Sequence, residues 1–225
     1  MENSASKKER SKTDKKAKIR EAYIDYLLEH GHEPNSVYQF MKMLKMKEGT
    51  FYDYYNSFSV IEKDIWKDYF DQTIERIKGE SVFNEYTVRE KLLAFYYTWI
   101  EVLKDNRSYV TYSASRIERR GLNWKNTSFL KPFKSGFLDF ANDLLAEGKE
   151  TEEIVDRPII GSRYDDGLWQ QLLFVLKFWV NDDSQGFERT DAAIEKAVNL
   201  SFDLMSRSAI DAAIDFARFL YQKRG

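Results

Sequence analysis

The chain has 225 residues, of which 43% are hydrophobic, and its formal net charge is −2. It has no cysteine, which excludes disulfides, thiolate metal sites and cysteine nucleophiles. Only three prolines and ten glycines interrupt it, and no β-branched segment alternates with period two, so an all-helical protein is expected. No segment reaches the roughly 18 uninterrupted apolar residues of a membrane span, and residues 1–20 lack a signal-like apolar stretch. These features predict a soluble, cytoplasmic protein with no membrane insertion.

Positive charge is concentrated at the N-terminal end of the chain. Residues 1–20 contain eight Lys or Arg residues and three acidic residues, which gives this segment a net charge of +5 and leaves −7 for the rest. We therefore expect residues 1–14 to form a basic, flexible arm that could neutralise the phosphates of a nucleic acid. On composition alone, a tail that only keeps the protein in solution is an equal alternative.

The first quarter of the chain predicts three helices in close succession. Apolar residues at helical spacing predict a helix over residues 14–29, which ends at Gly31. The segment from Pro34 to Ser36 supplies the start of a second, short helix. After a tight break at residues 45–47, a third and very short helix is expected over residues 48–55. Together they predict a helix-turn-helix domain over residues 15–60.

The rest of the chain, residues 61–225, predicts a larger helical domain. Its expected helices cover residues 59–78, 87–104, 108–119, 128–147, 164–180, 188–208 and 209–222, which gives about nine to ten helices in all. The helix over residues 164–180 is apolar in nearly every direction, so it must be buried or lie in an interface. We expect it to form a homodimer interface through residues 164–182 and 188–208, while complete burial within one monomer is the alternative.

Two segments carry a resemblance to a known family. The sequence SVYQFM from Ser36, followed by EGTFYDYYNS from Glu48, resembles the signature of the TetR/AcrR family of transcriptional regulators. The motif covers roughly residues 15–70, and the later helices match the family by layout only. Near the other end, FWVNDDS at residues 178–184, with Phe187 and Thr190, is similar to a TetR branch that includes the lipid-binding proteins of ubiquinone biosynthesis.

The resemblance implies that the third helix binds a double-stranded DNA operator. Gly49 would let this helix approach the DNA backbone, Thr50 and Tyr54 would face the DNA, and Tyr52 would reach a phosphate. Phe51 and Tyr55 are predicted instead to pack the small domain. The remaining residues of the predicted DNA-binding set come from the arm and the turns: Lys15, Lys16, Lys18, Ser36 and Lys47.

The sequence departs from the family at four positions that usually matter. The family usually has a glycine at Lys45, a small polar residue at Lys47, and basic residues at Glu48 and Phe58. Residues 21–58 have a net charge of −3, so the basic arm would have to supply much of the phosphate neutralisation. The alternative is a TetR-fold protein that has lost operator binding and carries a hydrophobic ligand or binds a protein partner.

Aromatic residues of the larger domain suggest a small apolar or lipid-like effector. A pocket between helices lined by such rings is how helical bundles bind small molecules, although aromatic stripes at helical spacing usually form the core. Arg116 could hold an acidic headgroup, or belong to a solvated basic face. The predicted effector-binding residues are Phe95, Tyr96, Trp99, Tyr112, Arg116, Trp124, Phe133, Phe137, Phe140, Trp169 and Phe174.

No pattern in the sequence indicates an enzyme. There is no phosphate-binding glycine loop, no nucleophile elbow and no pair of His metal ligands, and no cofactor is expected. The acidic pairs at residues 165–166 and 182–183 are predicted to cap helices and form turns. The family resemblance implies a TetR-like repressor that a small apolar or lipid-like effector releases from DNA.

Overall fold

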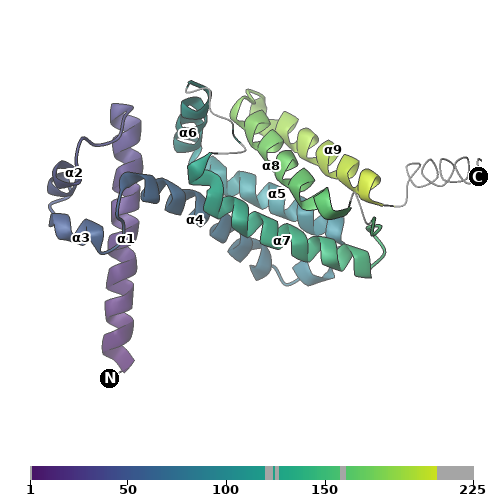
Figure 1. The fold of residues 1–225 in the computed structure, drawn as a ribbon, viewed down its shortest axis with the longest axis horizontal. Coiled ribbons are helices and arrows are strands. Elements are labelled where there is room, and N and C mark those ends of the chain that lie inside the picture. Colours follow the sequence, from purple (N-terminus) through teal and green to yellow (C-terminus); the bar gives the residue numbers. More distant parts are fainter. Residues whose placement is uncertain (1, 120–123, 125–126, 158–160, 207–225) are drawn as a thin grey trace, which may run out of the picture. The chain divides into compact units, whose positions relative to one another are not determined.

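A computed structural model describes residues 2–119, 124, 127–157 and 161–206 of the chain (Figure 1). Regular structure within these residues consists of nine α-helices and short 3-10 turns, with no strand. The all-helical class predicted from the sequence is confirmed. The helical extension predicted over residues 209–222 lies outside the described residues. None of the helices in this part of the chain is both long and apolar enough to cross a membrane.

Contacts among its residues divide the chain into two compact units. The N-terminal unit comprises Met1–Asp68 and Asn106–Pro132, and the C-terminal unit comprises Tyr69–Asp105 and Phe133–Gly225. This division differs from the domain boundary predicted at residue 60. The sequence pattern placed the whole segment after that boundary in one domain, whereas residues 106–132 belong to the N-terminal unit.

The N-terminal unit contains α1 (Glu2–His30), α2 (Val37–Met43), α3 (Glu48–Tyr52), the first part of α4 (Phe58–Gly79) and α6 (Arg107–Arg119). Helix α1 begins at Glu2 rather than near Asp14. Its first turns lack the apolar spacing on which the predicted start depended, but they are rich in residues such as Lys and Glu that favour helix. Whether this segment is flexible in solution stays a prediction.

An aromatic cluster fills the interior of the three N-terminal helices. The Phe58 ring lies parallel to the Tyr23 ring with centroids 5.4 Å apart, and it meets Phe40 and Phe51 edge-on at 5.5 Å each. Phe51 and Tyr55 are buried, as predicted. The departure from the family at Phe58 therefore has a physical reason, because a side chain at this position packs the small domain instead of reaching toward an anion.

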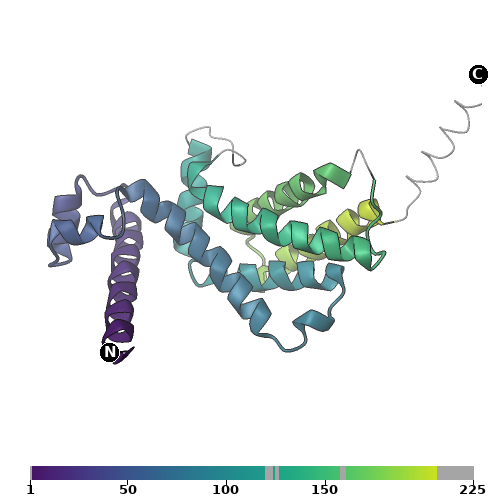
Figure 2. The same ribbon diagram turned by 60° about the horizontal axis from the view of Figure 1, so that its bottom comes forward.

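The C-terminal unit contains the rest of α4, α5 (Val88–Lys104), α7 (Lys131–Glu150), α8 (Tyr164–Val180) and α9 (Glu188–Met205). Helix α5 begins at a capping box, in which Thr87 and Glu90 each bind the other's backbone N–H. Helix α9 packs against both α5 and α8, and α8 and α9 run side by side in both views (Figures 1 and 2). Aromatic side chains of α5, α7 and α8 contact one another in the core of this unit.

A buried carboxylate fixes the connection between α8 and α9. One oxygen of Asp182 accepts hydrogen bonds from the Ser184 backbone N–H at 2.9 Å and hydroxyl at 2.6 Å. The other accepts from the Thr190 N–H at 2.9 Å and hydroxyl at 2.6 Å. Burial alone would raise the pKa of Asp182, but these hydrogen bonds lower it from 3.8 to about 2. The prediction that the acidic pair at residues 182–183 forms turns and caps is confirmed for Asp182.

Replacing Asp182 with Asn is expected to lower the free energy of unfolding at pH 7 by about 2 kcal/mol, because charge-assisted hydrogen bonds are lost. The pKa of Asp182 is lower in the folded state, so its contribution is present above the unfolded value and is lost as the pH falls toward 2. Urea unfolding at several pH values measures this. Asp183→Asn, at an exposed neighbour, is the control, and equal stability of the two variants at pH 7 would contradict the assignment.

Candidate nucleic-acid interface and effector site

A short turn joins α2 to α3, where the sequence predicts a helix-turn-helix. Helix α2 begins at Ser36, whose hydroxyl oxygen accepts a hydrogen bond from the Gln39 N–H at 3.2 Å. The chain then turns at Lys45, which has a φ of +55°. This is the left-handed region that favours glycine, and Lys45 stands where the family usually has one. The backbone of the turn therefore keeps the left-handed conformation that a glycine would adopt, and Lys45 is strained in it.

Replacing Lys45 with Gly is expected to relieve this strain, which is about 1 kcal/mol for a non-glycine residue. Glycine also makes the unfolded chain more flexible, so part of the gain is lost. The matched control is Lys47→Gly, because Lys47 has an ordinary φ of −71°. At this position glycine only makes the unfolded chain more flexible and relieves no strain. Urea unfolding should find Lys45→Gly more stable than Lys47→Gly by about 1 kcal/mol. The reverse order would contradict the strain assigned to Lys45.

Helices α2 and α3 present hydroxyl groups to the solvent. Tyr38 and Tyr52 are each 56% exposed, while Thr50 and Tyr54 are half-buried. A Cβ atom added at Gly49 would meet nothing within 4 Å, and its φ lies outside the left-handed region. The fold itself therefore does not require glycine at residue 49. Its small size leaves the start of α3 open to close approach by another molecule, which is the role that the family resemblance implies.

Two of the basic residues on α1 already have acidic partners. Lys16 Nζ lies 2.6 Å from Asp64 Oδ1, and Arg20 Nη1 lies 2.8 Å from Asp68 Oδ1. Tyr55 also donates a hydrogen bond to Asp64 at 2.8 Å. Lys15, Lys18 and Lys47 are exposed. Of the basic residues predicted to bind DNA, Lys16 is thus partly neutralised by α4. The pairing could have been anticipated from the spacing of four residues on both helices.

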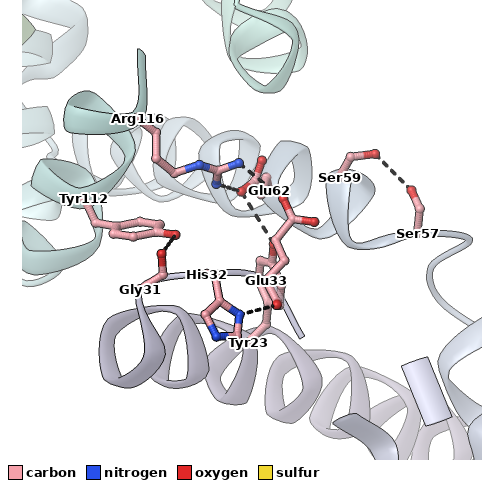
Figure 3. A network of polar contacts seen from close by, with 9 residues as sticks. All are labelled: Tyr23, Gly31, His32, Glu33, Ser57, Ser59, Glu62, Tyr112 and Arg116. Atoms are coloured by element: carbon pink, nitrogen blue, oxygen red, sulfur yellow. Dashed lines mark hydrogen bonds and ion pairs between the residues drawn. The ribbon is translucent and has the colours of Figure 1, made fainter. Parts of the chain in front are cut away.

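A second polar network joins α6 to the helices of the same unit (Figure 3). The Arg116 guanidinium forms an ion pair with Glu62 on α4 and another with Glu33, 3.2 Å away, in the connection after α1. Tyr23 donates a longer hydrogen bond, 3.5 Å, to the Glu62 oxygen that binds Arg116. Tyr112 donates to the Gly31 carbonyl at 3.2 Å. These contacts hold α6 against α4 and against the C-terminal end of α1 and the connection that follows it.

The electrostatics of this network follow from its burial. Glu62 is 6% exposed, and burial raises its pKa even though the Arg116 charge lowers it. Burial and the Glu62 charge likewise raise the pKa of Tyr23. Sequence reasoning placed Tyr112 and Arg116 in the effector site and missed Glu62. The structure assigns all three to the N-terminal unit, where the Arg116 guanidinium already binds two carboxylates.

Most of the other predicted effector residues come together in the C-terminal unit. Six of them are at most 1% exposed: Phe95, Tyr96, Trp99, Phe133, Phe137 and Trp169. Phe140 is half-buried and stacks on Phe95, with ring centroids 5.0 Å apart. Trp124 belongs to the N-terminal unit, and Phe174 is 51% exposed on α8. The structure thus unites seven of the eleven predicted residues and separates the other four.

An apolar groove runs along α8 and α9. Its volume is about 760 Å³. Phe174, at 51% exposed, and Leu200, at 59%, are its most prominent apolar side chains. Nine residues of α8 are nevertheless buried within the chain itself. The all-round apolar character of α8 therefore has two causes, namely packing inside the unit and an open face on the α9 side.

Comparison with known proteins identifies the family of the chain. Residues 91–220 match the family model described as the tetracyclin repressor-like, C-terminal domain. The chain belongs to the TetR family. A curated relative, the fatty acid metabolism regulator protein of Bacillus subtilis, is 23% identical over 181 residues, which are 78% of this chain and 89% of the relative. A crystal structure from Syntrophomonas wolfei, assigned to TetR-family transcriptional regulators, has a TM-score of 0.64 and 21% identity over 85% of this chain and 95% of its own.

Membership in the TetR family indicates which functions are typical of such a chain. TetR proteins are transcription regulators rather than enzymes, and binding of small molecules and formation of dimers are typical of the family. The likeness to the solved structure supports the fold of this TetR chain. The matched family model covers most of α5 and all of α6 to α9. The motif that resembles the TetR/AcrR signature lies before it, so the two together span most of the chain.

Proposed function

We propose that the chain is a dimeric repressor that binds an operator through α2 and α3 and is released by a small apolar or lipid-like effector. The observation that carries this proposal is the exposure of Tyr38 on α2 and of Tyr52 on α3, together with the open space at Gly49 near the start of α3. Both tyrosine side chains are exposed, and the fold itself does not require a glycine at residue 49. Hydroxyl donors and an open backbone suit contacts with DNA phosphates.

The dimer would form through the groove on α8 and α9. Its exposed Phe174 and Leu200 give two copies of the chain an apolar surface to bury. A two-fold dimer also places two recognition helices one helical turn of DNA apart, which a palindromic operator requires. The predicted interface over residues 164–182 and 188–208 therefore remains our proposal for how TetR-type pairing is achieved here.

The effector class rests on the rings of the C-terminal unit and on the relatives. Seven predicted residues form a continuous aromatic cluster between α5, α7 and α8. The Bacillus subtilis relative is named as a regulator of fatty acid metabolism, which fits a lipid-like effector at 23% identity. The resemblance of residues 178–190 to the ubiquinone-biosynthesis branch would also imply a lipid-like ligand, and it stays a prediction.

A second candidate function is a TetR-fold ligand carrier without an operator. The observation that favours it is the charge of the helix-turn-helix. Residues 21–58 have a net charge of −3, and Lys16 and Arg20 on α1 already pair with Asp64 and Asp68. DNA affinity depends mainly on phosphate neutralisation. The ligand-carrier function is therefore favoured if removing the basic N-terminal segment leaves DNA affinity unchanged.

The test is a titration of the protein against DNA that flanks its gene. Fluorescence anisotropy measures the binding at several salt concentrations. Tyr52→Ala should weaken binding roughly tenfold, while Tyr86→Ala in the C-terminal unit should leave it unchanged. Absence of salt-sensitive, sequence-preferring binding by the wild type would reject the repressor. Retained binding by Tyr52→Ala would reject the proposed contact face.

A further inference from the structure

Three buried aromatic side chains of α5 and α8 each have a polar atom without a hydrogen-bond partner among the described residues. They are Tyr96 Oη and Trp99 Nε1 on α5, and Trp169 Nε1 on α8. Each side chain is at most 1% exposed. Buried polar atoms in native proteins are almost always paired, and an unpaired one destabilises the folded state. Three in one core therefore point to a partner that the described residues do not supply.

The two indole rings lie beside one ring of α7, and the Tyr96 ring lies beside that of Trp99. The Phe133 ring centroid is 5.5 Å from that of Trp99 and 6.3 Å from that of Trp169, and Tyr96 lies 6.5 Å from Trp99. We call these four residues the Phe133 cluster. Gln171 on α8 has another unpaired buried atom, but its amide oxygen accepts a hydrogen bond from Ser201 on α9. That side chain faces the groove and is not part of the cluster.

The chemistry of the three groups restricts what could satisfy them. An indole N–H can only donate a hydrogen bond, and a phenol can donate one as well. The complementary group must therefore accept, as a carbonyl or carboxylate oxygen does. A positive charge also lies beside the cluster, because Lys134 Nζ is 5.6 Å from the centre of the Trp169 ring. This charge favours an acceptor that is itself negatively charged.

We propose that the Phe133 cluster holds the polar end of an effector, and that this end is a carbonyl or carboxylate oxygen bound by Tyr96, Trp99 and Trp169. The apolar remainder would pack against Phe95 and Phe140. The rings touch one another in the structure, so the ligand separates them when it enters. The inference rests on the proposed function only in calling the ligand an effector, since binding can be measured without DNA.

The experiment compares three nine-carbon probes on the full chain. These are 2-nonanone, which has a carbonyl oxygen, nonanoate, which has a carboxylate, and nonane, which has no acceptor. Tryptophan fluorescence and calorimetry give the dissociation constants. We expect the two acceptor probes to bind at least tenfold more tightly than nonane. If Lys134→Gln weakens the binding of nonanoate alone, the acceptor of the natural ligand is a carboxylate. If the variant changes the binding of neither probe, the acceptor is a neutral carbonyl.

Variants that keep a ring test the individual donors. Trp99→Phe and Trp169→Phe should each reduce the preference for acceptor probes several-fold, whereas Trp179→Phe, equally buried on α8, should not. Tyr96→Phe keeps the shape of the side chain and removes the unpaired hydroxyl. It should therefore raise the melting temperature of the free protein and weaken the binding of 2-nonanone. Equal binding of nonane, no binding of any probe, or an unchanged preference in these variants would overturn the proposal.

The operator titration separates this inference from the proposed function. If the wild type binds no operator but prefers acceptor probes, the Phe133 cluster is a ligand site and the repressor assignment fails. If the wild type binds an operator and no variant changes the probe preference, the cluster is only packing and the repressor assignment stands.

Discussion

Replacing Arg116 with Ala is expected to lower the free energy of unfolding of the N-terminal unit by about 3 kcal/mol, because Glu62 is then left buried without its partner. Arg116 and Glu62 have side chains 13% and 7% exposed, so water cannot replace the lost guanidinium easily. The matched control is Arg89→Ala, which removes an arginine whose side chain is 41% exposed. Exposed ion pairs contribute little, so this variant should lose less than about 1 kcal/mol.

The cost of Arg116→Ala should also depend on pH. The pKa of Glu62 is already raised by burial, and removing the Arg116 charge raises it further. A carboxyl group whose pKa is higher in the folded state destabilises that state increasingly as the pH rises above the unfolded value. Urea unfolding should therefore find a larger loss near pH 8 than near pH 5.

A double variant distinguishes an unpaired charge from a simple loss of packing. Arg116→Leu together with Glu62→Leu removes both charges, and buried ion pairs can often be replaced by apolar residues at little cost. The double variant should be more stable than Arg116→Ala alone. If Arg116→Ala costs no more than Arg89→Ala, or if the double variant is the less stable, the network does not hold α6 as described.

Neutralising the basic residues of the first turns of α1 is expected to produce the largest loss of operator affinity. The variant changes Lys7, Lys8, Arg10 and Lys12 to Gln. Each phosphate contact that is lost lowers the slope of log affinity against log salt by roughly 0.9, so the slope should fall by roughly 3 to 4 for each arm that engages DNA. At physiological salt the affinity should fall by about 100-fold or more.

The control for this variant removes the same charge from the C-terminal unit. It changes Arg76, Lys78, Lys104 and Lys149, which are exposed, to Gln. Fluorescence anisotropy across a salt series measures both variants. Among single changes, Lys15→Gln should matter more than Lys16→Gln, because Lys16 already pairs with Asp64. Equal losses in the two quadruple variants would show that only net charge matters and that the N-terminal segment makes no direct contact.

The sequence predicted the helices well where an apolar stripe defined them. Helix α5 was expected at residues 87–104 and found at Val88–Lys104, and α8 was expected at 164–180 and found at Tyr164–Val180. The start of α1 was missed, because residues 2–13 have no apolar face and only their intrinsic preference favours a helix. Helix α3 ends at Tyr52, earlier than the predicted residue 55.

The partners of the helices were harder to predict than the helices themselves. An apolar stripe on residues 108–119 shows that one face of α6 is buried, but it does not show which helix covers that face. Arg116 looked available for an effector because its two acidic partners, Glu33 and Glu62, are far from it in sequence. In the same way, no local pattern shows that Phe58 stacks on Tyr23.

The interleaved order of the two units limits how the protein can be dissected. The chain passes from one unit to the other after Asp68, after Asp105 and after Pro132. A fragment ending at residue 68 would lack α6, and with it the arginine that pairs with Glu62. Exchanging DNA-binding heads between relatives by a single cut near residue 60 would carry the same defect. A workable chimera needs both segments of the N-terminal unit, taken from the same parent.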